Sequence, residues 1–233
     1  MNKNIFKSAL VFTGVSLCLS LFSTTADARR EREPGEKLYM TKTCMACHGK
    51  AGKKAIRDYP NLAGQDKRYM VNQINNILDS SRMGSPGITG APRTLAMKGA
   101  LVSALTLKAS VSKEEIDLIT TWLAKQEPAA LIKPEVPLDP KSVAAGDKLF
   151  RAKCSVCHGE AGKTPNPGTP VVAGQKRNYL IIQLKDIYSR DRELNKWKAM
   201  RRVLSRLTPE EMEQLADYLS QVDHLEPQAT KQK

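Results

Sequence analysis

The chain has 233 residues, 41% of them hydrophobic but only 5% aromatic, and a formal net charge of +13. Its basic residues are spread over both halves, which argues against a nucleic-acid-binding arm. This length suits one large domain or two of about 100 residues.

Residues 1–28 have the pattern of a secretory signal. Lys3 and Lys7 precede an apolar run, and the sequence Ala-Asp-Ala ends at Ala28, which is the small-x-small pattern of a cleavage site. The run is shorter than the roughly 20 residues that span a bilayer, so a cleaved signal is favoured over a membrane anchor. The residue before Cys18 is a leucine and not a small residue, which argues against a lipoprotein. We therefore expect a periplasmic mature protein without Cys18.

The sequence Cys-Met-Ala-Cys-His at residues 44–48 returns as Cys-Ser-Val-Cys-His at residues 154–158. Matching residues follow at equal offsets, and this register indicates an internal duplication. We expect two domains, at residues 29–126 and 142–226. The matching pairs are Pro60 and Pro170, Gln65 and Gln175, Tyr69 and Tyr179, Gln73 and Gln183, Ile77 and Ile187, and Arg82 and Arg192.

Three helices are predicted in each copy. The first is a short opening helix, at residues 35–43 or 146–153. A middle helix follows, with apolar residues at helical spacing. Capping boxes then start the closing helices. The apolar positions of the middle helices are Met70, Ile74 and Ile77 in one copy and Leu180, Leu184 and Ile187 in the other, and the capping boxes are Ser112 with Glu115 and Thr208 with Glu211. Neither copy shows a convincing period-two strand pattern, so the expected fold class is all-α.

Residues 127–141 contain four prolines and are predicted to be an extended linker between the copies. The closing segment, residues 227–233, has no apolar residues to bury apart from one alanine, and we expect a flexible tail there.

The repeated pentad is the attachment pattern of c-type haem, because the two thiols form thioethers and the next imidazole becomes the fifth iron ligand. A single zinc site built from both pairs would need ligands about a hundred residues apart, against the usual 15 to 20 or so. A thioredoxin-like redox motif is also disfavoured, because it needs a βαβ context and the sequence shows no strand pattern. We therefore expect two covalently bound haems c, and an apoprotein that folds poorly because small domains with few aromatics have thin cores. The predicted haem residues are Cys44, Cys47, Cys154 and Cys157, with His48 and His158 as iron ligands.

Methionine is the expected sixth ligand at both irons. In the second copy Met200 is preferred, because Met212 belongs to the apolar face of the closing helix. In the first copy Met97 is preferred over Met83, because Met97 and Met200 share an Ala-Met-basic context with leucine four residues after the methionine. His224 lies beyond the last helix and is expected to be an ordinary exposed residue.

Through "CMACHG", "YPNLAGQ", "YMVNQI", "CSVCHG" and "VVAGQKRNYLIIQL", the chain resembles the dihaem cytochrome c4 family, in which two class I cytochrome c domains are fused. The resemblance covers essentially all of the mature sequence. It implies periplasmic electron transfer, His/Met ligation at both irons, and carbonyls of Pro60 and Pro170 that accept from the ligating histidines. The departures are "TPNPGTPVVAGQ" in the second copy and 14 extra residues between Arg82 and the first closing helix.

An iron with both axial positions filled by protein has no open site for a substrate. We therefore expect an electron carrier between a respiratory donor and an acceptor such as a terminal oxidase, with redox proteins as partners and no nucleic acid or small-molecule substrate. The alternatives are a dihaem oxidoreductase, such as a peroxidase or a sulfur-compound dehydrogenase, or a haem subunit of a larger enzyme complex.

The segment around Met200 concentrates positive charge, and we hypothesise that it docks an acidic partner surface, which a membrane-bound oxidase could also present. Its basic residues are Arg190, Arg192, Lys196, Lys198, Arg201, Arg202 and Arg206.

Overall fold

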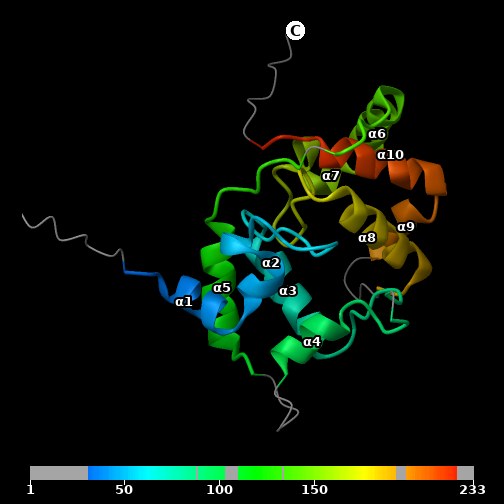
Figure 1. Ribbon diagram of the computed structural model, residues 1–233. Helices are drawn as coiled ribbons and strands as arrows, with labels where there is room; N and C mark the ends of the chain where they lie inside the picture. The colour runs from blue at the N-terminus through cyan, green and yellow to red at the C-terminus, as the bar shows by residue number, and fades with distance from the viewer. Residues whose placement is uncertain (1–30, 88, 103–109, 133, 193–197, 225–233) are drawn as a thin grey trace, which may run out of the picture. The chain divides into compact units, whose positions relative to one another are not determined.

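The computed structural model describes residues 31–87, 89–102, 110–132, 134–192 and 198–224 (Figure 1). The predicted signal at residues 1–28 and the predicted tail at residues 227–233 lie outside this part of the chain. The described residues of both sequence copies belong to one compact unit.

Each copy contributes the same series of helices. In the first copy these are α1 (Pro34–Thr41), α2 (Cys44–His48), the 3-10 turn η1 (Lys50–Gly52), α3 (Lys67–Leu78), α4 (Leu95–Leu101) and α5 (Lys113–Ala124). In the second they are α6 (Pro140–Lys153), α7 (Ser155–His158), η2 (Glu160–Gly162), α8 (Arg177–Ser189), α9 (Lys198–Leu204) and α10 (Pro209–Ser220). The described residues form two isolated β-bridges and no strand, which confirms the predicted all-α fold.

The closing helices start where the sequence predicts. The hydroxyl of Ser112 accepts from the backbone N–H of Glu115, and the carboxylate of Glu115 accepts from the N–H of Ser112. Thr208 and Glu211 make the same pair of bonds at the start of α10. Each box satisfies two backbone donors that a helix terminus otherwise leaves without partners.

Helix α6 begins earlier than expected, at Pro140, inside the predicted linker. The side chain of Asp139 caps the helix by accepting from the N–H of Lys141. Proline tolerates the first helical position because no intrahelical partner is needed for its nitrogen there.

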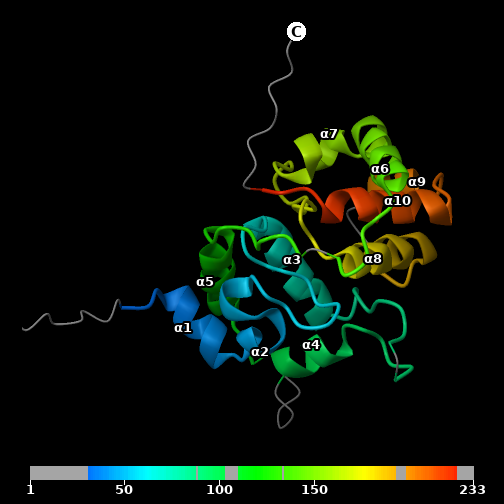
Figure 2. The same cartoon turned by 45° about the horizontal axis from the view of Figure 1, so that its top comes forward.

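In each copy the opening helix packs on the closing helix, α1 on α5 and α6 on α10 (Figures 1 and 2). A glycine permits each close approach: a Cβ at Gly35 would lie 2.6 Å from the Cβ of Trp122, and a Cβ at Gly146 would lie 2.8 Å from the Cβ of Tyr218. Each opening helix also supplies an aromatic residue that is only 1% exposed, Tyr39 or Phe150.

The two copies contact each other through a reciprocal set of hydrogen bonds near α3 and α8. Arg82 and Arg192 are both buried, and each guanidinium donates to a tyrosine and a glutamine of the opposite copy. The cross-copy bonds are Arg82 to Tyr179 (3.2 Å), Arg82 to Gln183 (2.9 Å), Arg192 to Tyr69 (3.0 Å) and Arg192 to Gln73 (2.8 Å). The prediction that Arg192 belongs to a solvent-facing docking surface is therefore wrong, because its charge is used inside the contact between the copies.

In the described part of the chain, no helix is both long enough and apolar enough to cross a membrane.

Candidate haem sites

The two pentads have the same local structure. His48 ends α2 and His158 ends α7, and each imidazole is 7% exposed. The Nδ1 atom of His48 lies 3.0 Å from the carbonyl oxygen of Pro60, and the Nδ1 atom of His158 lies 3.0 Å from that of Pro170. A carbonyl can only accept, so each Nδ1 carries the proton and Nε2 is the nitrogen left for a metal. These are the bonds that the family resemblance implies.

The residue after each pentad has to be glycine. Gly49 and Gly159 both have φ of 72°, a region that side chains rarely adopt. A Cβ at Gly49 would collide with the carbonyl oxygen of Lys54, and one at Gly159 would collide with that of Thr164. The tight turn at these glycines lets the chain fold back, so that a proline carbonyl reaches each histidine.

The four predicted haem cysteines are not in disulfides. Cys157 is exposed and Cys44, Cys47 and Cys154 are half-buried. Burial raises the pKa of Cys44, and it raises the pKa of Cys154 to about 11. Burial therefore favours the neutral thiol over the thiolate at Cys44 and Cys154. A thioether is also uncharged, so these surroundings fit covalent attachment to haem.

Unpaired buried donors supply a second test of whether a haem fits. Buried polar groups in proteins almost always have a hydrogen-bond partner, yet several buried N–H groups have none within the described residues. These are Asn61 Nδ2, Gln73 Nε2, Trp122 Nε1 and Arg192 Nε. Each of these atoms can only donate. Gln73 and Arg192 are bonded to each other in the contact between the copies, where a group with acceptor oxygens, such as the carboxylates of a haem, would satisfy their free N–H groups.

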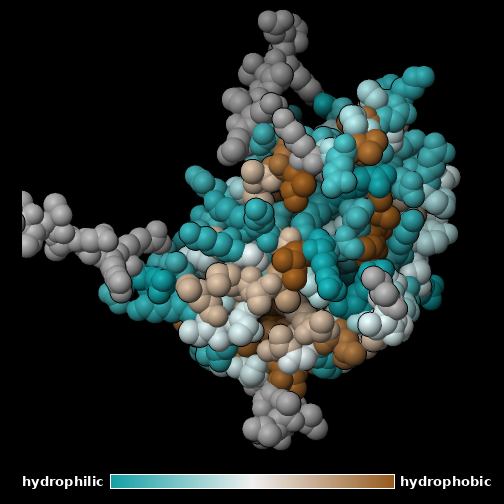
Figure 3. Space-filling view, viewed as in Figure 1, coloured by the Kyte–Doolittle hydropathy of each residue, from teal (hydrophilic) through white to brown (hydrophobic). Residues whose placement is uncertain are grey.

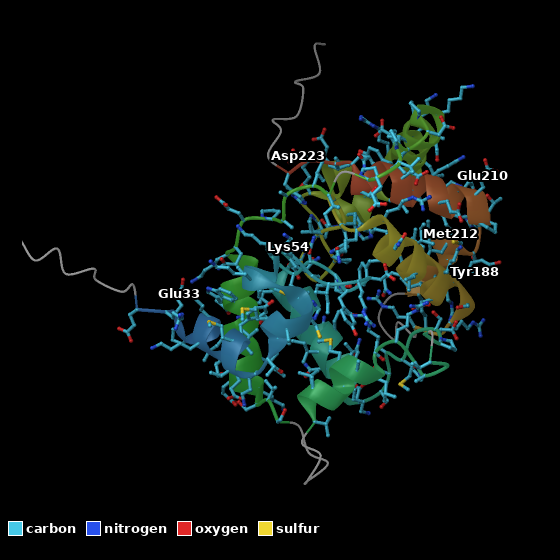
Figure 4. The ribbon with its side chains drawn as sticks, viewed as in Figure 1. Glu33, Lys54, Tyr188, Glu210, Met212 and Asp223 are labelled. Atoms are coloured by element: carbon cyan, nitrogen blue, oxygen red, sulfur yellow. The ribbon has the colours of Figure 1, made fainter. Side chains whose placement is uncertain are left out.

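The two preferred methionines occupy equivalent positions. Met97 is the third residue of α4 and Met200 is the third residue of α9, and each packs against the core of its own copy. Met83 is 36% exposed, and Met212 is a fully buried core residue of α10 (Figure 4). The sequence does not predict α4 or α9 as helices. The Ala-Met-basic pattern that both contain indicates only that the two segments are equivalent.

His224 differs from its expectation as an exposed residue. It is half-buried, and its Nε2 atom lies 2.8 Å from the carbonyl oxygen of Ala173. The chain after α10 turns back onto the loop that follows Pro170, so the ring bonds to backbone there.

Known proteins resemble this chain over most of its length. A family model described as cytochrome c matches residues 32–127 and 143–223. A cytochrome c4 from Stutzerimonas stutzeri is 29% identical over 216 residues, which cover 88% of this chain and 96% of the relative. A thiosulfate dehydrogenase electron acceptor from Stutzerimonas stutzeri strain A1501 is 26% identical over 223 residues, covering 91% and 93%. The crystal structure of reduced recombinant cytochrome c4 from Pseudomonas stutzeri superposes with a TM-score of 0.63 at 27% identity, covering 81% of this chain and 97% of that one.

Proposed function

Because the chain belongs to the cytochrome c family, as a dihaem electron-transfer cytochrome of the c4 type, we propose that it is a periplasmic carrier that passes electrons from a respiratory donor to an acceptor such as a terminal oxidase. Each copy would hold one haem through its two cysteines, with His48 or His158 as an iron ligand. When bound, the haem supplies a one-electron couple, and the protein supplies its ligands and surroundings.

The observation that carries this proposal is the equivalence of the two copies. Each has a buried histidine with a fixed tautomer and a half-buried methionine on a short helix, Met97 or Met200. A histidine and a methionine held to each iron would leave a substrate no coordination site. The relative that is named as an electron acceptor of a thiosulfate dehydrogenase supports a carrier more than an enzyme, since an acceptor receives electrons from its partner.

Electrons would leave and enter where the pentads reach the surface. Val156 is 82% exposed and Met45 is 41% exposed, and each lies between the two cysteines of its pentad. On the face shown in Figure 3, apolar residues gather in the lower middle and hydrophilic residues surround them. A haem edge bonded to these cysteines would be close to a docked partner.

Carbon monoxide distinguishes a carrier from an enzyme. We expect no change in the visible spectrum when it is added to the reduced holoprotein, because protein ligands close both irons. Met97→Ala and Met200→Ala should each open one iron, so that about one carbon monoxide binds per protein. Met83→Ala and Met212→Leu are the matched controls, and neither should bind it. Binding to the unsubstituted protein would favour the dihaem oxidoreductase alternative.

We also propose that exposed basic residues around α9 dock an acidic partner. Arg192 is excluded by its burial, and Lys196 lies outside the described residues. The remaining members are Arg190, Lys198, Arg201, Arg202 and Arg206, all exposed. A cluster of one sign raises the rate of encounter with a partner of opposite sign, and salt screens it over about 10 Å at 0.1 M.

Charge reversal tests this docking surface. Arg201→Glu with Arg202→Glu should slow electron transfer to an acidic acceptor by about tenfold at low salt and flatten the dependence of the rate on ionic strength. Lys113→Glu with Lys141→Glu makes the same change in net charge on α5 and α6 and should have a smaller effect. Equal rates for the two double variants across the salt series would show that only net charge matters.

A further inference from the structure

Each haem-binding histidine is linked to a glutamine of the opposite copy through a single peptide group. The carbonyl of Pro60, which accepts from His48, and the N–H of Asn61 belong to the same peptide unit. That N–H donates to Oε1 of Gln175 at 3.0 Å, and Nε2 of Gln175 donates back to the carbonyl of Asn61 at 3.0 Å. Gln175 is 7% exposed, so this link is shielded from water.

The second copy has the same link in the reverse direction. The carbonyl of Pro170 accepts from His158, and the N–H of Val171 in that peptide unit donates to Oε1 of Gln65 at 2.7 Å. Nε2 of Gln65 returns a bond to the carbonyl of Val171 at 2.9 Å. Gln65 is also 7% exposed. The glutamine of each Ala-Gly-Gln sequence therefore bonds to the peptide group after the proline of the opposite copy.

Hydrogen bonds in a chain polarise one another. When the N–H of a peptide group donates to a glutamine oxygen, its carbonyl becomes a stronger acceptor. A stronger bond at Nδ1–H makes an imidazole a more basic ligand, and a more basic ligand favours the oxidised iron. Hydrogen bonding around the ligands is one of the means by which a protein sets a haem potential.

We propose that Gln175 and Gln65 are positioning residues that act across the contact between the copies, each lowering the reduction potential of the haem in the other copy. This inference rests on the proposed function, because it requires a haem iron on His48 and on His158. The contact between the copies then does more than hold them together, because each copy supplies a hydrogen-bonding side chain next to the haem ligand of the other.

The test uses the full-length holoprotein with Gln175→Met and Gln65→Met. Methionine has a volume similar to that of glutamine but cannot make the two amide hydrogen bonds. Both glutamines line a cavity of about 20 Å³ at this contact, which has room for about one water. Gln183→Met is the control within the same contact: it removes the bonds that the Gln183 side chain accepts from Arg82 and Arg192, and it leaves both histidine links in place. Gln175→Asn and Gln65→Asn, which keep the amide but shorten its reach, serve if a methionine variant does not fold.

Two readouts are needed. The ¹⁵N shift of each histidine Nδ1 in the reduced protein reports the strength of its hydrogen bond. The potential of each haem is assigned from the histidine whose signals change first during stepwise oxidation. We expect Gln175→Met to weaken the bond at His48 and raise the potential of the N-terminal haem, and Gln65→Met to do the same at His158. The equilibrium constant for electron exchange between the haems should then shift about threefold to tenfold, in opposite directions in the two variants.

The inference is overturned if the changes fall on the glutamine's own copy, fall equally on both haems, or match those of Gln183→Met. It is also overturned if both Nδ1 shifts and both potentials stay unchanged. A failure of the proposed function would be visible separately, as a missing haem or as carbon monoxide binding in the unsubstituted protein.

Discussion

The double variant Cys154→Ser with Cys157→Ser will carry one covalent haem per chain instead of two, and its second copy will lose most of its stability. Phe150, Cys154 and Met200 belong to or pack against one apolar cluster in that copy. A domain of about 100 residues has a thin core of its own, and a bound cofactor stabilises the folded state by its binding free energy.

Mass spectrometry of the denatured chain counts the covalent haems, and circular dichroism during heating follows unfolding. The matched double variant, Cys44→Ser with Cys47→Ser, should lose the other haem and keep the second copy folded. Two haems retained in either double variant would contradict the assignment of the pentads.

A Gly146→Val variant will be destabilised by about 3–5 kcal/mol, the upper range for single substitutions. A Cβ at this position would lie 2.8 Å from the Cβ of Tyr218 and would collide with the backbone carbonyl of Gln214. Backbone cannot move aside as a flexible side chain can. The variant therefore has to separate α6 from α10, the opening and closing helices of the second copy.

Guanidinium chloride unfolding of the holoprotein measures this loss. Ala144→Val is the control, because Ala144 is exposed on the same helix and the change costs only about 0.5 kcal/mol of helix propensity there. Equal midpoints for the two variants would show that α6 and α10 can separate without loss.

Several features of the fold follow from local sequence patterns. The capping boxes at Ser112 and Thr208 and the apolar spacing of the middle helices predict three helices per copy, since both signals act within a few residues. The same holds for the pentads, whose spacing matches bonds to one porphyrin. The short helices α4 and α9 were not predicted, because seven residues give too few turns for a periodic pattern.

The opening, middle and closing helices and the duplication could be read from the sequence alone, and the haem residues were predicted from it, because these signals depend on residues close together in the chain. The burial of Arg192 and the reach of Gln65 and Gln175 into the opposite copy became visible in the folded chain alone. The glutamines' partners lie 106 and 114 residues away. The partners of a buried polar side chain depend on which distant groups the fold brings next to it, because buried polar groups need hydrogen bonds. The spacing of nearby residues in the sequence does not contain this information.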